Sequence, residues 1–161
     1  MTIGVGVVHS KNGGKTFETS QRAELRTCGC CDNGVTVDSK GTVYVAFRNE
    51  DAAGGKTTVR DSAVIRSYDK GVTWSEPVEL GDDDWVFNGC PESGPRILAD
   101  AEDRLHGLYW TGKEERPGIY YTVSEDGAKS FATPAIASHE GTVAMVWSDA
   151  GGLKFARLGA S

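Results

Sequence analysis

Short runs of alternating apolar and polar residues dominate this chain, and a turn separates each run from the next. Residues 34–37 and 42–47 flank a turn at 38–41, whose Asp and Gly suit a tight hairpin loop. Residues 95–98 and 105–110 repeat this arrangement further along the chain. No segment shows a convincing helical period, so the pattern predicts an all-β protein built from hairpins.

One eight-residue pattern occurs three times at a constant spacing. The copies begin at Ser10, Ser67 and Ser124, so each starts 57 residues after the previous one. A fixed period of this length is typical of stacked supersecondary units. The positions that define the copies are Ser10, Asn12, Gly14 and Phe17, then Ser67, Asp69, Gly71 and Trp74, then Ser124, Asp126 and Phe131.

The repeated pattern has the composition of a tight turn rather than of an active site. A Ser hydroxyl and an Asp carboxylate can hydrogen-bond to nearby main-chain groups, and Gly allows positive φ. The closing Trp or Phe is expected to pack against the core of its sheet. Asn12 replaces Asp in the first copy and Ala128 replaces Gly in the third, so we expect these two turns to be less regular.

Each copy lies between two strand-like segments, and two further strands lie between successive copies. Four strands per unit, with no helix, predict a β-propeller of four-stranded antiparallel blades. The strand count gives about three blades, half of a six-bladed ring, in a single domain over residues 1–161. Such an array leaves open sheet edges, which proteins normally cover. We therefore expect a homodimer that closes a six-bladed ring, or else a longer protein to which this chain belongs.

The repeated turn resembles the Asp-box, or bacterial neuraminidase repeat, of sialidases and related propellers. The resemblance implies that each turn joins the third and fourth strands of a blade, on the rim away from the active site, with a structural role. Two further segments, Cys28-Gly-Cys30-Cys31 and the stretch from Trp85 to Pro91, are similar to a bacterial branch of sialidase-like proteins. In that branch a Cys-x-Cys-Cys segment is followed one blade later by Cys-Pro.

Composition and charge narrow the classes of function. Hydrophobic residues make up 39% and charged residues 25% of the 161 residues, which is typical of a globular protein. The net charge is -6 and the sequence pI about 5.1, so nucleic acid is not an expected partner. The early apolar run at residues 3–8 is too short to span a bilayer and is a poor signal peptide, so we expect no membrane partner. We expect a secreted or periplasmic protein if a leader has been removed, and otherwise a cytoplasmic one.

The family resemblance implies three arginines that bind the substrate carboxylate, an acid/base Asp and a Tyr–Glu nucleophile pair. None of these arginines can be assigned in this chain. The only partial match to the family's Arg-Ile-Pro motif is Pro95-Arg96-Ile97-Leu98, which lacks the final proline and lies in the middle of the chain. By residue type alone, Arg48, Arg60 and Arg96 are candidate anion contacts. Asp61 is the acidic catalytic candidate, and Arg48 and Arg60 are the other catalytic candidates.

The four cysteines are the more distinctive chemistry. Cys31 and Cys90 are 59 residues apart, and each precedes the first strand of a predicted blade, which places both near the mouth of the central channel. Cys28 and Cys30 must lie within a few ångströms, because so few residues separate them from Cys31. Disulfides, a Zn or Cu thiolate site and free thiols all remain open.

These patterns together predict a binding scaffold for a ligand, a glycan or a partner protein, without catalysis by a single chain. The predicted ligand residues are Arg48, Trp85, Asn88 and Arg96, on the ring face beside the cysteines, with carbohydrate as a candidate ligand. One alternative is an exo-sialidase-like glycoside hydrolase whose site is completed by oligomerisation. The other is a thiolate metal-binding protein.

Overall fold

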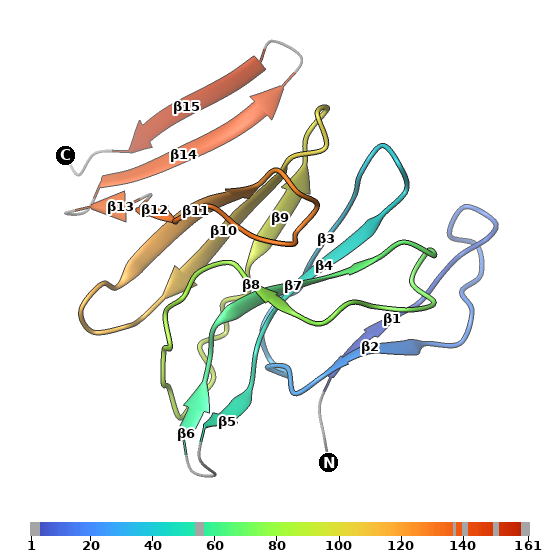
Figure 1. The fold of residues 1–161 in the computed structure, drawn as a ribbon, viewed down its shortest axis with the longest axis horizontal. Coiled ribbons are helices and arrows are strands. Elements are labelled where there is room, and N and C mark those ends of the chain that lie inside the picture. The colour runs from blue at the N-terminus through green and yellow to red at the C-terminus, as the bar shows by residue number, and fades with distance from the viewer. Residues whose placement is uncertain (1–3, 54–56, 137, 140–141, 150–151, 159–161) are drawn as a thin grey trace.

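A computed structural model describes residues 4–53, 57–136, 138–139, 142–149 and 152–158. Within these ranges the chain forms antiparallel strands and no helix, so the all-β prediction is confirmed. Figure 1 shows the strands grouped into separate sheets that do not close into a ring. No helix of the described residues could cross a membrane.

The first four-stranded sheet has the order β3-β4-β7-β8, so its strands lie in chain order, with β5 and β6 inserted between β4 and β7. The turn at 38–41 joins β3 to β4 as expected, and the Gly41 N–H donates to the Asp38 carbonyl at 3.1 Å. The segment that connects β4 to β7 forms a separate hairpin, β5 with β6, which extends beyond the ends of these two strands. The strands are β3 (Gly34–Val37), β4 (Val43–Arg48), β5 (Asp51–Ala53), β6 (Thr57–Val59), β7 (Ser62–Ser67) and β8 (Val78–Glu79).

The second four-stranded sheet has the order β9-β10-β11-β12 and repeats the topology of the first. A two-stranded sheet, β1 with β2, precedes these sheets in the chain, and a three-stranded sheet, β13-β14-β15, follows them. Their strands are β1 (Gly4–Val7), β2 (Gln21–Leu25), β9 (Arg96–Ala99), β10 (Leu105–Thr111), β11 (Gly118–Ser124), β12 (Ala135–Ile136), β13 (Ser138–His139), β14 (Thr142–Asp149) and β15 (Gly152–Leu158).

The two central strands of the first four-stranded sheet, β4 and β7, are buried on both faces. Tyr44 and Ala46 of β4 belong to a core shared with the second four-stranded sheet. Val45 and Phe47, which point the other way because side chains alternate along a strand, belong to a core shared with β1. This explains why β4 reads as a nearly continuous apolar run, and burying Phe47 alone contributes roughly 2–3 kcal/mol.

Three hydrogen bonds recur in all three repeated turns, and the second and third turns share two more. In the second turn, Ser67 Oγ donates to Asp69 Oδ1 at 2.8 Å and accepts the Gly71 N–H at 2.7 Å. Asp69 also accepts the main-chain N–H of Thr73 at 2.8 Å and its hydroxyl at 2.6 Å. The turn beginning at Ser124 repeats this arrangement, and the turn beginning at Ser10 repeats it except that the Thr16 hydroxyl accepts a bond instead of donating one.

The expectation of a less regular turn is wrong for the hydrogen bonds of the third turn and is confirmed in part for the first. The Asn12 Oδ1 accepts the Thr16 N–H at 2.9 Å, as an Asp would, and its Nδ2 donates to the Thr16 hydroxyl at 2.8 Å. Ala128 adopts a φ of 60°, the left-handed conformation that Gly71 adopts with a φ of 87°. The amide oxygen therefore replaces the carboxylate, and Ala128 tolerates a conformation that usually favours Gly.

The closing aromatic residues of the three turns differ in burial. Trp74 packs on the core shared by β1 and the first four-stranded sheet, and Phe131 packs on the core between the two four-stranded sheets. Phe17 is 63% exposed, so the expectation that it packs against a core is wrong for this chain.

Both four-stranded sheets carry their repeated turns at the same end. Because Val43 pairs with Ser67, the turn after β7 lies beside the hairpin turn that precedes β4. Leu105 pairs with Ser124 in the second sheet, which gives the same arrangement. We call this the turn end; the opposite end of the strands holds the predicted site residues.

Candidate functional site

The end of the sheets opposite the turns gathers four segments that are far apart in the sequence. The Cys28 N–H donates to the Arg48 carbonyl at 2.9 Å, and the Arg60 N–H donates to the Trp85 carbonyl at 2.8 Å. These main-chain bonds connect loops that precede or follow different strands. We call this region the loop end, and within the described ranges it comprises residues 26–33, 48–53 with 57–61, 81–95 and 110–117.

Arg48, the last residue of β4, organises the loop end from inside and is only 1% exposed. Its Nε donates to the Ser93 carbonyl at 2.7 Å, its Nη2 to the Trp110 carbonyl at 2.7 Å, and its Nη1 to the Arg60 carbonyl. Its guanidinium lies 5.3 Å from the centre of the Trp85 ring. Burial lowers the pKa of Arg48 to about 10, which leaves the side chain charged at neutral pH. Arg48 therefore joins three loop-end segments.

Two buried carboxylates accompany this guanidinium. Asp61 is 2% exposed and accepts the main-chain N–H groups of Asp84 at 2.8 Å and Trp85 at 3.0 Å. Asp83 Oδ1 lies 2.8 Å from Arg116 Nη2, in an ion pair whose angles do not form a hydrogen bond. Burial raises the pKa of both Asp61 and Asp83. The loop end thus holds carboxyl groups whose charged forms are disfavoured by their surroundings.

An aromatic cluster lies beside these charges. The ring of Trp85, which is buried, stacks on that of Phe87 with centroids 5.3 Å apart and contacts Trp110 edge-on at 5.0 Å. Phe87 is 39% exposed, and its carbonyl accepts a long 3.4 Å bond from Arg60 Nε. Asn88 follows it and is exposed. Phe87 is therefore an exposed ring that stacks on the buried ring of Trp85.

The four cysteines form one cluster at the loop end. Disulfide bonds join Cys28 to Cys31 and Cys30 to Cys90. All four Sγ atoms lie within 4.8 Å of one another. Cys28 and Cys31 are buried, whereas Cys30 and Cys90 are exposed. The cluster is therefore partly open to reagents in solution.

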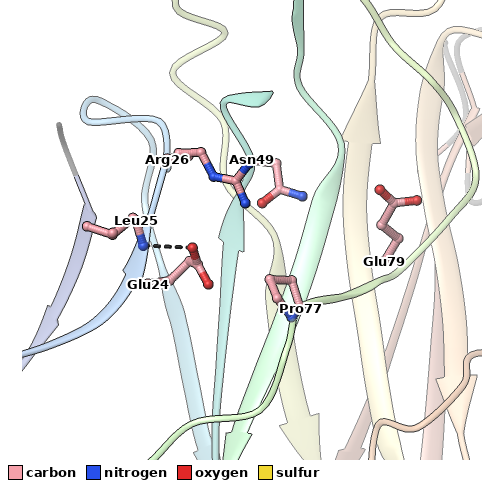
Figure 2. A pocket seen from close by; sticks show the side chains of 6 residues that line it. All are labelled: Glu24, Leu25, Arg26, Asn49, Pro77 and Glu79. Carbon is pink, nitrogen blue, oxygen red and sulfur yellow. Dashed lines mark hydrogen bonds between the residues drawn. The ribbon is translucent and has the colours of Figure 1, made fainter. Parts of the chain in front are cut away.

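A polar hollow of about 430 Å³ lies between the ends of β2 and β8. Figure 2 shows Glu24 and Leu25 on one side and Pro77 and Glu79 on the other, with Arg26 and Asn49 between them. Glu24 Oε1 accepts the Leu25 N–H at 2.7 Å. None of these residues was predicted as a site residue, and the hollow borders the loop end through Arg26 and Asn49.

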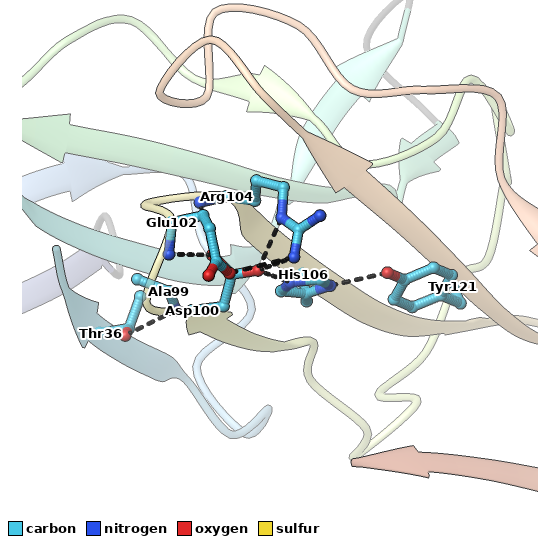
Figure 3. A network of polar contacts seen from close by, with 7 residues as sticks. All are labelled: Thr36, Ala99, Asp100, Glu102, Arg104, His106 and Tyr121. Atoms are coloured by element: carbon cyan, nitrogen blue, oxygen red, sulfur yellow. Dashed lines mark hydrogen bonds and ion pairs between the residues drawn. The ribbon is translucent and has the colours of Figure 1, made fainter. Parts of the chain in front are cut away.

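A second polar network lies at the turn end (Figure 3). Asp100 accepts the main-chain N–H of Arg104 at 2.8 Å and its Nε at 2.7 Å, and His106 Nε2 lies 2.8 Å from Asp100 Oδ2. His106 Nδ1 in turn lies 2.7 Å from the Tyr121 hydroxyl. Burial raises the pKa of Asp100, but the bonds from His106 and Arg104 outweigh it and hold that pKa well below its usual range. These contacts close the turn between β9 and β10, which is a structural role.

No protein-family model matches this chain, and no curated protein matches it either. Several solved structures resemble it, two of them as follows. A protein of unknown function from Dyadobacter fermentans DSM 18053 aligns with a TM-score of 0.59 and 19% identity, over 94% of this chain and 51% of its own. The Hadza microbial sialidase Hz136 aligns with a TM-score of 0.57 and 20% identity, over 95% of this chain and 37% of its own.

The chain has a sialidase-like β fold. Identities of this size establish the fold alone, and the chain spans only about half of one matched protein and about a third of the other. Within this fold, the loop end brings together nearly all the residues predicted for a site. They are Cys28, Cys30, Cys31, Arg48, Arg60, Asp61, Trp85, Asn88 and Cys90.

The accessibility of the predicted residues differs sharply within the sialidase-like fold. Arg48, Arg60, Asp61 and Trp85 are buried, so a ligand could reach them only after their cover moves. Asn88 and Arg96 are exposed, and Arg96 Nη2 lies 2.9 Å from Asp32 Oδ2. The predicted roles in ligand binding or catalysis stay predictions.

Sequence reasoning missed four residues that shape the loop end: Asp83, Phe87, Trp110 and Arg116. Phe87 could have been predicted as a site residue, because it lies between Trp85 and Asn88 in a predicted loop, where an apolar ring is expected to be exposed. Asp83 gave none, since it lies in a run of three aspartates that reads as a solvated turn.

Proposed function

We propose that this chain is a segment of an Asp-box propeller whose loop end binds carbohydrate, and that a single chain does not turn its ligand over. The observation that carries the proposal is the exposed Phe87 ring, fixed by its stacking on buried Trp85. Ligand sites generally combine aromatic side chains with a few convergent polar groups. Asn88 supplies an amide on the same loop, and Arg96 supplies an exposed guanidinium suited to a sugar carboxylate.

Titration with sialyllactose, followed by tryptophan fluorescence, tests carbohydrate binding. We expect saturable quenching from Trp85 and at least tenfold weaker binding for Phe87→Ala. The matched control is Tyr68→Ala, which removes another exposed aromatic ring, 68% exposed, at the turn end. Equal affinities of Phe87→Ala and the unmodified protein would refute the site. Lack of binding to sialyllactose and to a panel of neutral glycans would refute the carbohydrate ligand.

The propeller itself is supported by three features. The two four-stranded sheets share one topology and pack face to face, and the repeated turns carry the residue types of the Asp-box and share three hydrogen bonds. Phe17 is exposed where Trp74 and Phe131 are packed. We infer that a further blade covers Phe17, and that a second copy of the chain supplies it as a homodimer. Light scattering should give about twice the 17.2 kDa chain mass, and a monomer at all concentrations would contradict the dimer.

A glycoside hydrolase is the second candidate, and the buried carboxyls favour it. Asp61 and Asp83 interact with the Arg48 charge, and burial raises the pKa of each, as in carboxyls that act as general acids. The resulting site would need residues from a second copy. Hydrolysis of a fluorogenic sialoside that is lost in a folded Asp61→Asn variant would support this alternative. No turnover at high protein concentration would exclude it and leave the binding scaffold.

A further inference from the structure

The cysteine cluster has the geometry of a metal site as well as of a pair of disulfides. Its four Sγ atoms come from two loops, three from the first and Cys90 from the second, yet all lie within 4.8 Å of one another. Within the described ranges, no other set of three or more His, Cys, Asp or Glu ligand atoms converges in this way. Four thiolates around one centre are the ligand set of structural zinc sites.

The sulfur positions fit one tetrahedral ion. With Zn–S bonds of about 2.3 Å, a tetrahedral site places its sulfurs roughly 3.8 Å apart. The unbonded pair Cys28 Sγ and Cys30 Sγ is already 3.5 Å apart. Opening the two disulfides would let the bonded pairs separate toward the same spacing, so small side-chain movements suffice and the loops need not move.

The two loops are held together by contacts that do not depend on the disulfides. The Arg48 carbonyl accepts the Cys28 N–H at 2.9 Å, while the Arg48 Nε donates to the Ser93 carbonyl in the Cys90 loop at 2.7 Å. Gly94 approaches Asp32 so closely that a Cβ there would collide with the Asp32 main chain. A reduced cluster would therefore keep its four thiols close together, as a preorganised site requires.

The pairing of the cysteines also distinguishes this cluster from simple structural bridges. Cys30–Cys90 closes a separation of 60 residues and stabilises the fold as a long bridge does. Cys28–Cys31 closes a separation of only 3 residues and restricts the unfolded chain little. Since Cys30 and Cys90 are exposed, a reductant can attack the long bridge from solvent.

We propose that the four cysteines form a redox-gated zinc site. In the oxidised protein they are two disulfides and bind no metal. A dithiol reductant delivers two electrons and two protons to each disulfide and becomes a disulfide itself, which leaves four thiols. One Zn²⁺ then displaces four thiol protons and is held as a tetrathiolate that joins the two loops in place of the Cys30–Cys90 bridge. The proposal is independent of carbohydrate binding.

Zinc uptake by the full chain tests the proposal. The protein is reduced with a phosphine, which converts each disulfide and one water into two thiols and a phosphine oxide and competes little for metal. We expect one Zn²⁺ per chain by native mass spectrometry, and none in the oxidised protein. Cobalt should give the intense visible absorption of a tetrahedral thiolate complex. Cys28→Ser and Cys90→Ser should each weaken zinc binding at least tenfold, whereas Val86→Ser, in the same loop as Cys90, should not.

Three outcomes would overturn the proposal. The first is a reduced, folded chain that takes up no zinc in competition with a chromogenic chelator. The second is zinc affinity that is unchanged by oxidation or by both serine substitutions. The third concerns folding: if reduction unfolds the chain, as measured by circular dichroism, zinc must refold it, and failure to refold refutes the site.

Discussion

Replacing Arg48 with Met tests whether one side chain organises the loop end. Met keeps much of the apolar length but removes the guanidinium that donates to three main-chain carbonyls. Each hydrogen bond from a charged group contributes roughly 1.5–3 kcal/mol, and each buried carbonyl left without a donor costs about 1–3 kcal/mol. Part of this loss is recovered because Met needs no desolvation of a charge, the effect that lowers the pKa of Arg48 to about 10. We therefore expect a net loss of about 3–5 kcal/mol in the free energy of unfolding.

Urea unfolding monitored by tryptophan fluorescence measures this loss, because the Trp85 ring lies 5.3 Å from the Arg48 guanidinium. Arg48→Lys should lose an intermediate amount, since an ammonium group cannot reproduce the planar fork that reaches several carbonyls. The control is Arg22→Met on exposed β2, which should change stability by less than about 0.5 kcal/mol. If Arg48→Met remained within about 1 kcal/mol of the unmodified protein at an unchanged m-value, the hydrogen bonds of Arg48 would not organise the loop end.

Three further predictions concern the turns and the exposed Phe17. Hydrogen bonds within its turn, first from a threonine hydroxyl, lower the pKa of Asp69 from 3.8 to about 2. The stabilisation that ionised Asp69 gives the folded protein is therefore complete above pH 3.8 and is lost as the pH falls toward 2. Asp69→Asn should reduce the fall in the free energy of unfolding over this pH range, as measured by circular dichroism. An unchanged fall would count against the role of Asp69. Gly71→Ala should lower the free energy of unfolding in urea more than Gly41→Ala does. Both glycines have φ near +85°, a conformation that costs an Ala about 1–2 kcal/mol. Only at Gly71 would the new Cβ also meet His9, at 2.6 Å. Equal losses would contradict that contact. Phe17→Asp should leave the far-ultraviolet circular-dichroism spectrum unchanged and weaken the dimer at least tenfold in sedimentation equilibrium, and an unaffected dimer would place the interface elsewhere.

The strands could be predicted from the sequence because alternation and turn residues act locally. The hairpin turn at 38–41 and the repeated turns depend on residues within a few positions of one another, so their hydrogen bonds follow from the pattern. The β5–β6 hairpin escaped prediction because its strands have three residues each, too few for a period to show. The exposure of Phe17 also escaped, since a repeated motif does not reveal which of its copies lacks a neighbouring sheet.

The sequence predicted which residues gather at the loop end but not the contacts that hold them together. The arrangement of equivalent positions in successive units correctly brought Cys31 close to Cys90. The partners of Arg48, in contrast, are main-chain carbonyls at Arg60, Ser93 and Trp110, and a carbonyl has no residue-type signature. Cysteine spacing likewise left disulfides and metal ligation open, because both require the same closeness of sulfur atoms.

The polar groups at the two ends of the sheets differ in burial and in what they stabilise. At the turn end, Asp69 and Asp126 are exposed and are satisfied by their own turns, so they stabilise local structure only. At the loop end, Arg48 and Asp61 are buried, and burial disfavours the charge of each. Apolar residues of similar volume often stabilise a core better than buried charges do, so stability alone does not account for charges concentrated at one end. A fixed arrangement of main-chain groups, aromatic rings and paired cysteines does account for them, because Arg48 holds the loops that present all three.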